Sequence, residues 1–329
     1  MTPNPLHPRS WLSRSVAALS LIGALLAAGG AQAQAQPKEL RIGFQKYGTL
    51  TLLKARGDLE QRLAPQGIAV KWTEFPAGPQ LLEGLNVGSI DFGTVGEAPP
   101  IFAQAAGADL VYVANQPPGP AGEAIVVLKD SPLKSVADLK GRKVALNKGS
   151  NVHYLLVKAL EKAGLRYADV QPVFLPPADA RAAFERGSVD AWVIWDPFLA
   201  AAERQIGARQ LTDGRGLVAN HQFYLAARPY AEKHPQVIQA IVDELAKLDR
   251  WAAADPKAVA TLLAPQIGLD APITELAASR FAYGIQPITP QVAAEQQKIA
   301  DTFHELKLIP KPVRIHDALP RPAATTAAR

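Results

Sequence analysis

The sequence contains no cysteine, and only one methionine, among its 329 residues. Without cysteine the chain can form no disulfide and no cysteine-based metal or nucleophilic site. It also has no cysteine to which a lipid could be attached after a leader. The absence of thiols suits a protein that works in an oxidising compartment outside the cytoplasm.

The short motifs of common enzyme classes are also missing. We find no G-x-S-x-G, no P-loop and no G-x-G-x-x-G. The histidines beyond the N-terminal region, at positions 153, 221, 234, 304 and 316, show no spacing typical of metal ligands. Catalytic groups can be scattered along a chain, so this absence favours binding without chemistry rather than proving it. We expect no enzymatic activity, no metal and no cofactor.

Apolar runs are short, and the one near the N-terminus, Val16–Ala28, is shorter than the ~20 residues of a membrane-spanning helix. Arg9 and Arg14 precede it, and small residues up to Ala35 offer two A-x-A cleavage sites. This pattern predicts a secretory signal peptide over residues 1–35. The alternative, an uncleaved anchor helix, is disfavoured because glycines interrupt the run and no stop-transfer pattern follows.

Charge of either sign is not concentrated. Removing residues 1–35 takes away two arginines and no acidic residue, so the formal net charge falls from +5 to +3. Such a balance permits an anionic ligand. The sequence lacks the clustered Lys and Arg residues of a nucleic-acid-binding face, so we expect no nucleic-acid partner.

One stretch of the chain occurs twice. Phe75–Pro100 and Pro176–Phe198 both read as helix, tight turn, buried strand and next helix start. Gly88-Ser-Ile-Asp91 corresponds to Gly187-Ser-Val-Asp190, and each ends six residues before another acid, Glu97 or Asp196. A unit repeated once at long spacing indicates two lobes of similar build, with a cleft between their matched loops.

Short apolar segments alternate with helical segments along the chain, which predicts an α/β fold with doubly wound, mostly parallel sheets flanked by helices. The expected strands are Leu40–Phe44, Ala69–Phe75, Ile90–Thr94, Leu110–Ala114, Ala124–Leu128, Lys143–Leu146, Val170–Phe174, Ala191–Trp195 and Phe223–Ala227. A first helix is expected from a cap at Thr49 or Thr51 to about Arg62. Gln116–Gly122 is the expected crossover between lobes.

These elements divide the mature chain into a first lobe, residues 36–116 and 229–318, and a second lobe, residues 117–228. Four helices that each begin near a proline, Pro235–Ala254, Pro256–Ile267, Pro272–Phe281 and Pro290–Leu306, are expected to return to the first lobe. Residues 319–329 are rich in Pro, Ala and Thr and are expected to be disordered.

Three predicted helix starts could bind an anion in the cleft. Helix N-termini carry unpaired N–H groups and partial positive charge, and glycine lets an anion approach the backbone. The candidates are Gly78-Pro-Gln80, Gly96-Glu-Ala98 and Gly149-Ser-Asn151, in which Gln80, Ser150 and Asn151 add neutral donors. Each could equally be an ordinary helix cap.

Trp195 ends a predicted strand and should face the cleft, where an indole can cover an aliphatic or aromatic group, whereas Trp192 should lie in the core. The acids Glu97 and Asp196 leave several roles open. They could act as acid and base, bind an ammonium group, or cap helices. We expect capping for Asp196 and leave the role of Glu97 open.

Several segments together resemble the aliphatic sulfonate-binding proteins of ABC importers. They are Arg41-Ile-Gly-Phe-Gln-Lys46, Glu74-Phe-Pro-Ala-Gly-Pro-Gln80, Leu85-Asn-Val-Gly-Ser-Ile-Asp91, Pro99-Pro-Ile-Phe-Ala-Gln-Ala-Ala-Gly-Ala-Asp109, Pro177-Ala-Asp-Ala-Arg-Ala-Ala-Phe184, Val189-Asp-Ala-Trp-Val-Ile-Trp-Asp-Pro197 and Phe223-Tyr-Leu-Ala-Ala-Arg-Pro-Tyr230. The resemblance covers nearly all of the mature chain. It implies a two-lobed periplasmic-binding-protein fold of type II.

The resemblance further implies a monomeric periplasmic receptor that captures an organosulfonate and delivers it to a membrane permease and its ATPase for sulfur acquisition. The residues it places along the ligand cleft are Gln45, Gly78, Gln80, Gly96, Glu97, Ser150, Asn151, Trp195 and Asp196. The family commonly has Asp at the position of Glu97. Two alternatives stay open: a receptor of the same fold for taurine or nitrate, and an enzyme of thiamine-precursor synthesis, for which His153 is the nearby candidate.

Overall fold

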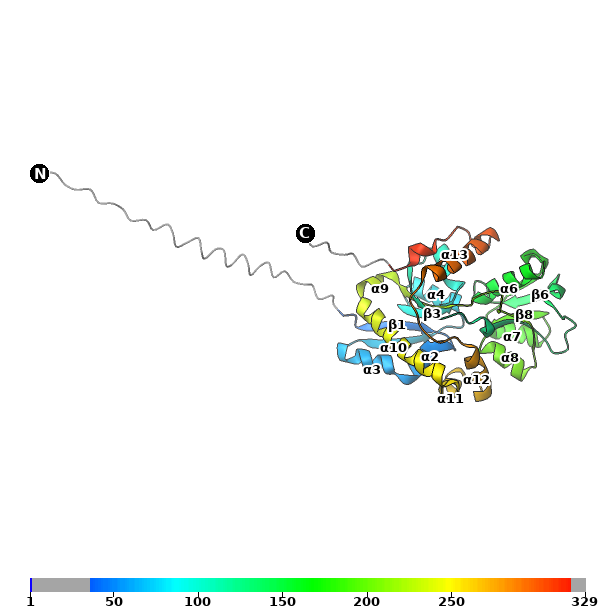
Figure 1. The fold of residues 1–329 in the computed structure, drawn as a ribbon, viewed down its shortest axis with the longest axis horizontal. Helices are drawn as coiled ribbons and strands as arrows, with labels where there is room; N and C mark the ends of the chain where they lie inside the picture. Colours follow the sequence, from blue (N-terminus) through cyan, green and yellow to red (C-terminus); the bar gives the residue numbers. More distant parts are fainter. Residues whose placement is uncertain (2–35, 321–329) are drawn as a thin grey trace. The chain divides into compact units, whose positions relative to one another are not determined.

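The computed structural model describes Met1 and residues 36–320 (Figure 1). The predicted signal peptide, apart from Met1, and the predicted tail beyond Pro320 lie outside the described residues. Within the described range, no helix is both long and apolar enough to cross a membrane.

The chain builds two five-stranded sheets, and each sheet with the helices packed on it is one lobe. The first-lobe sheet contains β1 (Glu39–Phe44), β2 (Ala69–Glu74), β3 (Phe92–Gly96), β4 (Leu110–Asn115) and β10 (Gln222–Ala227). The second-lobe sheet contains β5 (Glu123–Val127), β6 (Lys143–Leu146), β7 (Gln171–Phe174), β8 (Ala191–Trp195) and β9 (Arg209–Asp213).

The two sheets have the same topology. The strand order is β2-β1-β3-β10-β4 in the first lobe and β7-β6-β8-β5-β9 in the second. In each sheet the first three strands run parallel, and the fourth, β10 or β5, is antiparallel to both of its neighbours. This arrangement confirms the predicted α/β fold with two similar lobes.

One predicted strand was assigned to the wrong lobe. Phe223–Ala227 was expected to end the second lobe, but β10 pairs with β3 and β4 in the first-lobe sheet. The chain therefore crosses back before β10, through residues 214–221, and the second-lobe boundary at residue 228 is too late. β9 was missed because its sequence, RQLTD, is half-buried throughout and has no apolar pattern.

Helices cover both faces of each sheet. In the first half of the chain they are α2 (Gly48–Arg56), α3 (Asp58–Leu63), α4 (Gly78–Asn86) and α5 (Pro99–Ala105). The second lobe adds α6 (Asn151–Lys162), α7 (Pro177–Glu185) and α8 (Phe198–Gln205). Short 3₁₀ turns, η1 (Ala64–Gln66), η2 (Pro120–Gly122), η3 (Val136–Leu139), η4 (Tyr167–Asp169) and η5 (Ile315–Ala318), lie between or after them.

The predicted helix from Thr49 or Thr51 to Arg62 is wrong in two respects. It breaks at Gly57, whose φ of 70° is left-handed and ends α2 before α3 begins. Neither threonine caps it, because Tyr47 is the N-cap residue. The Thr49 hydroxyl donates to Asp249 and the Thr51 hydroxyl to the Gln45 carbonyl.

The C-terminal helices are α9 (Arg228–Lys233), α10 (Pro235–Ala254), α11 (Pro256–Ile267), α12 (Ala271–Arg280) and α13 (Pro290–Glu305). As predicted, α10 and α11 pack on α2 of the first lobe. α12 differs, because it contacts α8 of the second lobe through Ile273 and Ala277 against Ala200 and Ala201. Figure 1 shows α12 beside α8, between the two halves of the fold.

The repeated Gly-Ser-x-Asp segment performs the same structural task in both lobes. Asp91 accepts the main-chain N–H of Arg41 at 2.8 Å, and Asp190 accepts that of Lys143 at 2.8 Å. Asp91 lies just before β3 and binds β1, and Asp190 lies just before β8 and binds β6. Each carboxylate therefore links two neighbouring parallel strands of its sheet. This shared contact explains why the acid recurs at matched positions.

Candidate functional site

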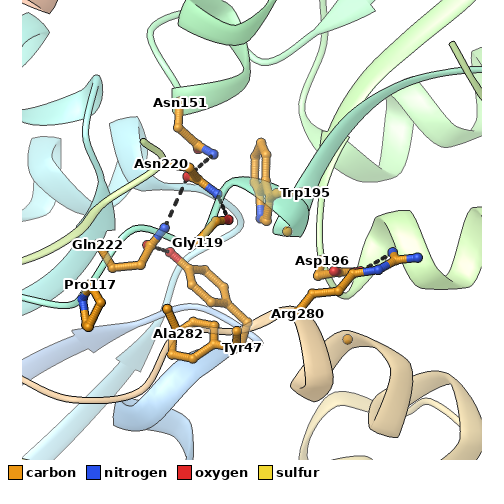
Figure 2. Close-up of a pocket in the computed structure, with 13 residues that line it drawn as sticks. Tyr47, Pro117, Gly119, Asn151, Trp195, Asp196, Asn220, Gln222, Arg280 and Ala282 are labelled. Atoms are coloured by element: carbon orange, nitrogen blue, oxygen red, sulfur yellow. Dashed lines mark hydrogen bonds and ion pairs between the residues drawn. The ribbon is translucent and has the colours of Figure 1, made fainter. Parts of the chain in front are cut away.

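The loops that follow β1, β6 and β8 meet at a small pocket (Figure 2). Its lining comes from both lobes, from the two connections between them and from the end of α12: Tyr47, Pro117, Gly119, Gly122, Asn151, Trp195, Asp196, Asn220, Gln222, Ala277, Arg280, Phe281 and Ala282. The pocket thus lies beyond the carboxyl ends of the strands, where open α/β sheets bind ligands.

A chain of polar side chains forms one wall of the pocket. The Tyr47 hydroxyl donates to the Gln222 amide oxygen at 2.8 Å, and Asn151 Nδ2 donates to Asn220 Oδ1 at 3.1 Å. Asn220 in turn donates to the Gly119 carbonyl at 2.9 Å. Figure 2 shows these contacts joining the second lobe to both connections. The wall carries neutral donors and acceptors, which can bind a charged ligand without a fixed counter-charge.

Four apolar residues also line the pocket, together with the charged Asp196 and Arg280, and form its apolar wall: Trp195, Ala277, Phe281 and Ala282. Trp195 is 6% exposed and packs edge-on against Phe198, with ring centroids 6.2 Å apart. A pocket with a polar wall and an apolar wall suits a ligand with a polar head and a hydrocarbon part.

Two of the helices that begin near the cleft, α4 and α6, have no side-chain cap. The N-cap residue of α4 is Ala77, which has no capping group, and Ser150 before α6 donates its hydroxyl to the Asn147 carbonyl instead of capping. Their first N–H groups thus receive no side-chain acceptor, and both helix starts follow strands that end at the cleft. Uncapped N-termini of this kind can bind an oxyanion.

An ionic contact crosses between the lobes beside the pocket. Arg280, at the end of α12, lies 2.7 Å from Glu203 Oε2 and 3.6 Å from Asp196 Oδ1. Asp196 Oδ1 also accepts the N–H of Ala200. This contact caps the first turn of α8, the role expected of Asp196. Burial raises the pKa of Asp196 to about 7, against the opposing effect of Arg280.

The lobes touch closely next to this pocket. Gly96 ends β3 at a point where an added Cβ would lie 2.9 Å from the Cβ of Asn151 in the second lobe. Ala77, before α4, packs into the apolar core of the second lobe. The structure therefore has the lobes in contact across the cleft, and a glycine at position 96 permits that approach.

A family model, that of the NMT1-like family, matches residues 33–266. An aliphatic sulfonates-binding protein of Escherichia coli (strain K12) is 49% identical over 312 residues, which cover 94% of this chain and 97% of that protein. The chain belongs to the aliphatic sulfonate-binding protein family.

Two further family members agree with this result. A Bacillus subtilis (strain 168) protein of the same name is 33% identical and covers 92% of each chain. The alkanesulfonate-binding protein SsuA from Xanthomonas axonopodis pv. citri, solved with MOPS bound, superposes with a TM-score of 0.84 at 44% identity. That match covers 88% of this chain and all of the SsuA chain.

Nine residues of this chain were predicted to line the ligand cleft. Three of them line the pocket itself: Asn151, Trp195 and Asp196. Gln45 lies directly behind it, where its amide donates to Tyr47 and to the Thr94 carbonyl. Gly96 abuts Asn151, as described above.

The remaining predicted residues lie near the pocket without lining it. Gly78 and Gln80 form the first turn of α4, and the buried Oε1 of Gln80 has no hydrogen-bond partner. The Ser150 hydroxyl is occupied by Asn147. Glu97 is buried behind the polar wall, where its Oε2 accepts the N–H of His221 at 3.1 Å.

Sequence reasoning missed Tyr47, Asn220, Gln222 and Arg280. Asn220 carried the clearest signal, since it stands just before the apolar run of a predicted strand and asparagine is a residue type that favours turns. Correct placement of β10 would have identified residues 214–221 as a second connection through the cleft. Arg280 gave no signal, because its role depends on α12 packing against the other lobe.

His153, the candidate for catalysis, is structural. Its side chain is fully buried, its Nδ1 accepts the N–H of Gly149 at 3.2 Å, and its Nε2 lies 2.8 Å from the Tyr167 hydroxyl. Burial lowers the pKa of His153 to about 4. Its ring packs on Phe102 and Phe303, away from the pocket.

Proposed function

We propose that this protein is a periplasmic receptor that captures an aliphatic sulfonate between its two lobes and delivers it to an ABC importer. The carrying observation is the pocket itself, in which Asn151 at the uncapped start of α6 and the apolar Trp195 both belong to the lining. Identity of 49% to a protein named for binding aliphatic sulfonates supports the same ligand class.

In this proposal the sulfonate head binds near the starts of α4 and α6. The head would accept hydrogen bonds from the main chain at Gly78, Gln80 and Asn151, with the Gln80 amide as a further donor. A sulfonate stays ionised at any working pH, so the receptor needs donors and no proton acceptor. The hydrocarbon part then lies between Trp195 and Phe281, where its burial is favourable.

The receptor delivers its ligand unchanged. The sequence has no cysteine, and His153 is engaged in a buried contact outside the pocket. The one carboxyl group among the described lining residues, that of Asp196, accepts the N–H of Ala200 and lies 3.6 Å from Arg280. The partners in this proposal are a membrane permease and its ATPase, and the receptor acts as a monomer in the periplasm.

Isothermal titration calorimetry tests the ligand class. Butanesulfonate and hexanesulfonate should bind, whereas nitrate and sulfate, which have no hydrocarbon part, should bind far more weakly. Heat with nitrate and none with any sulfonate would contradict the proposal. Mass spectrometry of the sulfonate after incubation should return it intact, and conversion to a product would support the enzymatic alternative.

A further inference from the structure

Two carboxyl groups are buried at the contact between the lobes, outside the pocket lining. Glu97 follows β3 in the first lobe and is 1% exposed. Glu123 begins β5 in the second lobe and is 0% exposed. The charge of Glu97 acts on Glu123, so the two groups form an interacting pair.

Each carboxyl group is only half satisfied. Glu97 Oε2 accepts the N–H of His221, and Glu123 Oε2 accepts from Asn151 Nδ2. The Oε1 atom of each residue is buried and has no hydrogen-bond partner. A carboxylate buried in this way loses its hydration without full replacement, which strongly favours the neutral acid.

The groups around the pair supply no ion pair to either acid in the described chain. His221 faces Glu97 from the second connection through its main-chain N–H, Tyr154 comes from α6, and α13 contributes Glu295 and Lys298. The positive charge of Lys298 lowers the pKa of Glu295, whereas the negative charge of Glu295 raises the pKa of Glu97. Burial raises the pKa of Glu97 to about 7 and that of Glu123 well above its ordinary value.

The burial of this pair depends on contact between the lobes. Asn151, which holds Glu123, also bonds to Asn220 and abuts Gly96 of the first lobe. Separation of the lobes would break the approach of Gly96 to Asn151 and admit water to both carboxyl groups. Hydrated glutamates ionise with a pKa of about 4.3.

We propose that closing the lobes on a ligand moves protons from solvent onto the Glu97–Glu123 pair, so that binding takes up protons and weakens as the pH rises. Each step adds one H⁺ to one carboxylate and gives one neutral carboxylic acid. The inference rests on the proposed function. It makes Glu123 a positioning residue that acts through Asn151, and Glu97 a positioning residue that acts through the main chain of His221.

The direction of the pH effect follows from the two states. Below about pH 4.3 both acids are protonated in the open and the closed form, so affinity is independent of pH. Above that, the open form must take up a proton to close, and Kd rises about tenfold per pH unit for each proton taken up. The rise for Glu97 ends near pH 7, where the closed form also loses its proton.

Calorimetry of the full mature chain with hexanesulfonate measures the protons directly. Titrations at pH 6.5 in phosphate, imidazole and Tris differ in buffer ionisation enthalpy, and the slope of the observed enthalpy against it counts protons. Sulfonate buffers are excluded because a related SsuA was solved with MOPS bound. We expect uptake of about one to two protons and a Kd that rises at least tenfold from pH 5.5 to 7.5.

Amide variants assign the effect to this pair. Glu123→Gln and Glu97→Gln mimic the neutral acids and need no proton at that position, so each should bind roughly tenfold more tightly than the parent protein at pH 5.5 and should flatten the pH profile. The double variant should take up no protons. Glu185→Gln, in an exposed ion pair with Arg181 of the second lobe, is the matched control and should behave like the parent protein.

Sulfonate binding whose enthalpy is independent of the buffer and whose Kd is constant from pH 5.5 to 7.5 would overturn the coupling and leave the receptor function standing. Parent-like proton uptake in a folded double variant would also overturn it. The measurements on the parent protein decide the question if a variant fails to fold. Absence of any sulfonate binding would remove the receptor function and the coupling together.

Discussion

Replacing Trp195 with alanine should change how affinity depends on the length of the ligand's chain. Trp195 is one of the apolar residues that line the pocket, and Phe281 and Ala277 lie on the side contributed by α12. A hydrocarbon chain between these groups would be covered by the indole on one side and by α12 on the other. The substitution removes the first cover and leaves the second.

The size of the change follows from burial of methylene groups. Each fully buried CH₂ contributes about 0.8 kcal/mol, or roughly a fourfold decrease in Kd. From ethanesulfonate to hexanesulfonate the parent protein can therefore gain up to about 3 kcal/mol. Because Trp195→Ala removes one of the two covering sides, the variant should retain about half of that gain in binding free energy. Its Kd should then decrease roughly twofold for each added methylene group.

Calorimetric Kd values for ethane-, butane- and hexanesulfonate provide the comparison. The control is Trp251→Ala in α10, where Arg56 lies 5.2 Å from the ring, remote from the pocket lining. It should leave the chain-length dependence unchanged. An equal loss of affinity for all three ligands in Trp195→Ala would refute contact between the indole and the chain, even if that loss were large.

Three further substitutions test other contacts. Gln80→Ala should weaken sulfonate binding by about 1.5–3 kcal/mol, through loss of a hydrogen bond to a charged head, and an unchanged Kd by calorimetry would exclude that contact. Arg280→Met should weaken the free energy of binding by about 1–2 kcal/mol, because it removes the ion pairs of Asp196 and Glu203 across the lobes. Arg181→Met, which breaks an ion pair within the second lobe, should leave the binding free energy unchanged. Gly96→Ala should hinder closure, so small-angle scattering should show a smaller ligand-induced decrease in radius of gyration with little change in melting temperature. A normal decrease would show that Asn151 yields to the added methyl group.

The sequence predicted the fold well where local pattern and structure agree. β1, β6 and β8 are short buried runs, and α10 and α11 begin at prolines with the predicted bounds. The sequence was a poorer guide to which strands pair when they lie far apart in the chain. β10 is indistinguishable by pattern from a second-lobe strand, and its membership in the first sheet depends on contacts with β3 and β4.

The candidate site was predicted in part for the same reason. Asn151, Trp195 and Asp196 sit at ends of predicted elements, so strand-end reasoning placed them at the pocket. Gln222 reaches it from the start of β10, directly after the second connection, and Arg280 reaches it from the end of α12. No local pattern encodes these routes, since they arise from how the chain crosses twice between the lobes.

The most direct test is a crystal structure of the mature protein with hexanesulfonate bound. The account predicts the sulfonate oxygens within hydrogen-bond distance of main-chain N–H groups at the starts of α4 and α6, with the alkyl chain against Trp195. A sulfonate bound elsewhere, or a head held by side-chain cations with both helix starts vacant, would contradict it.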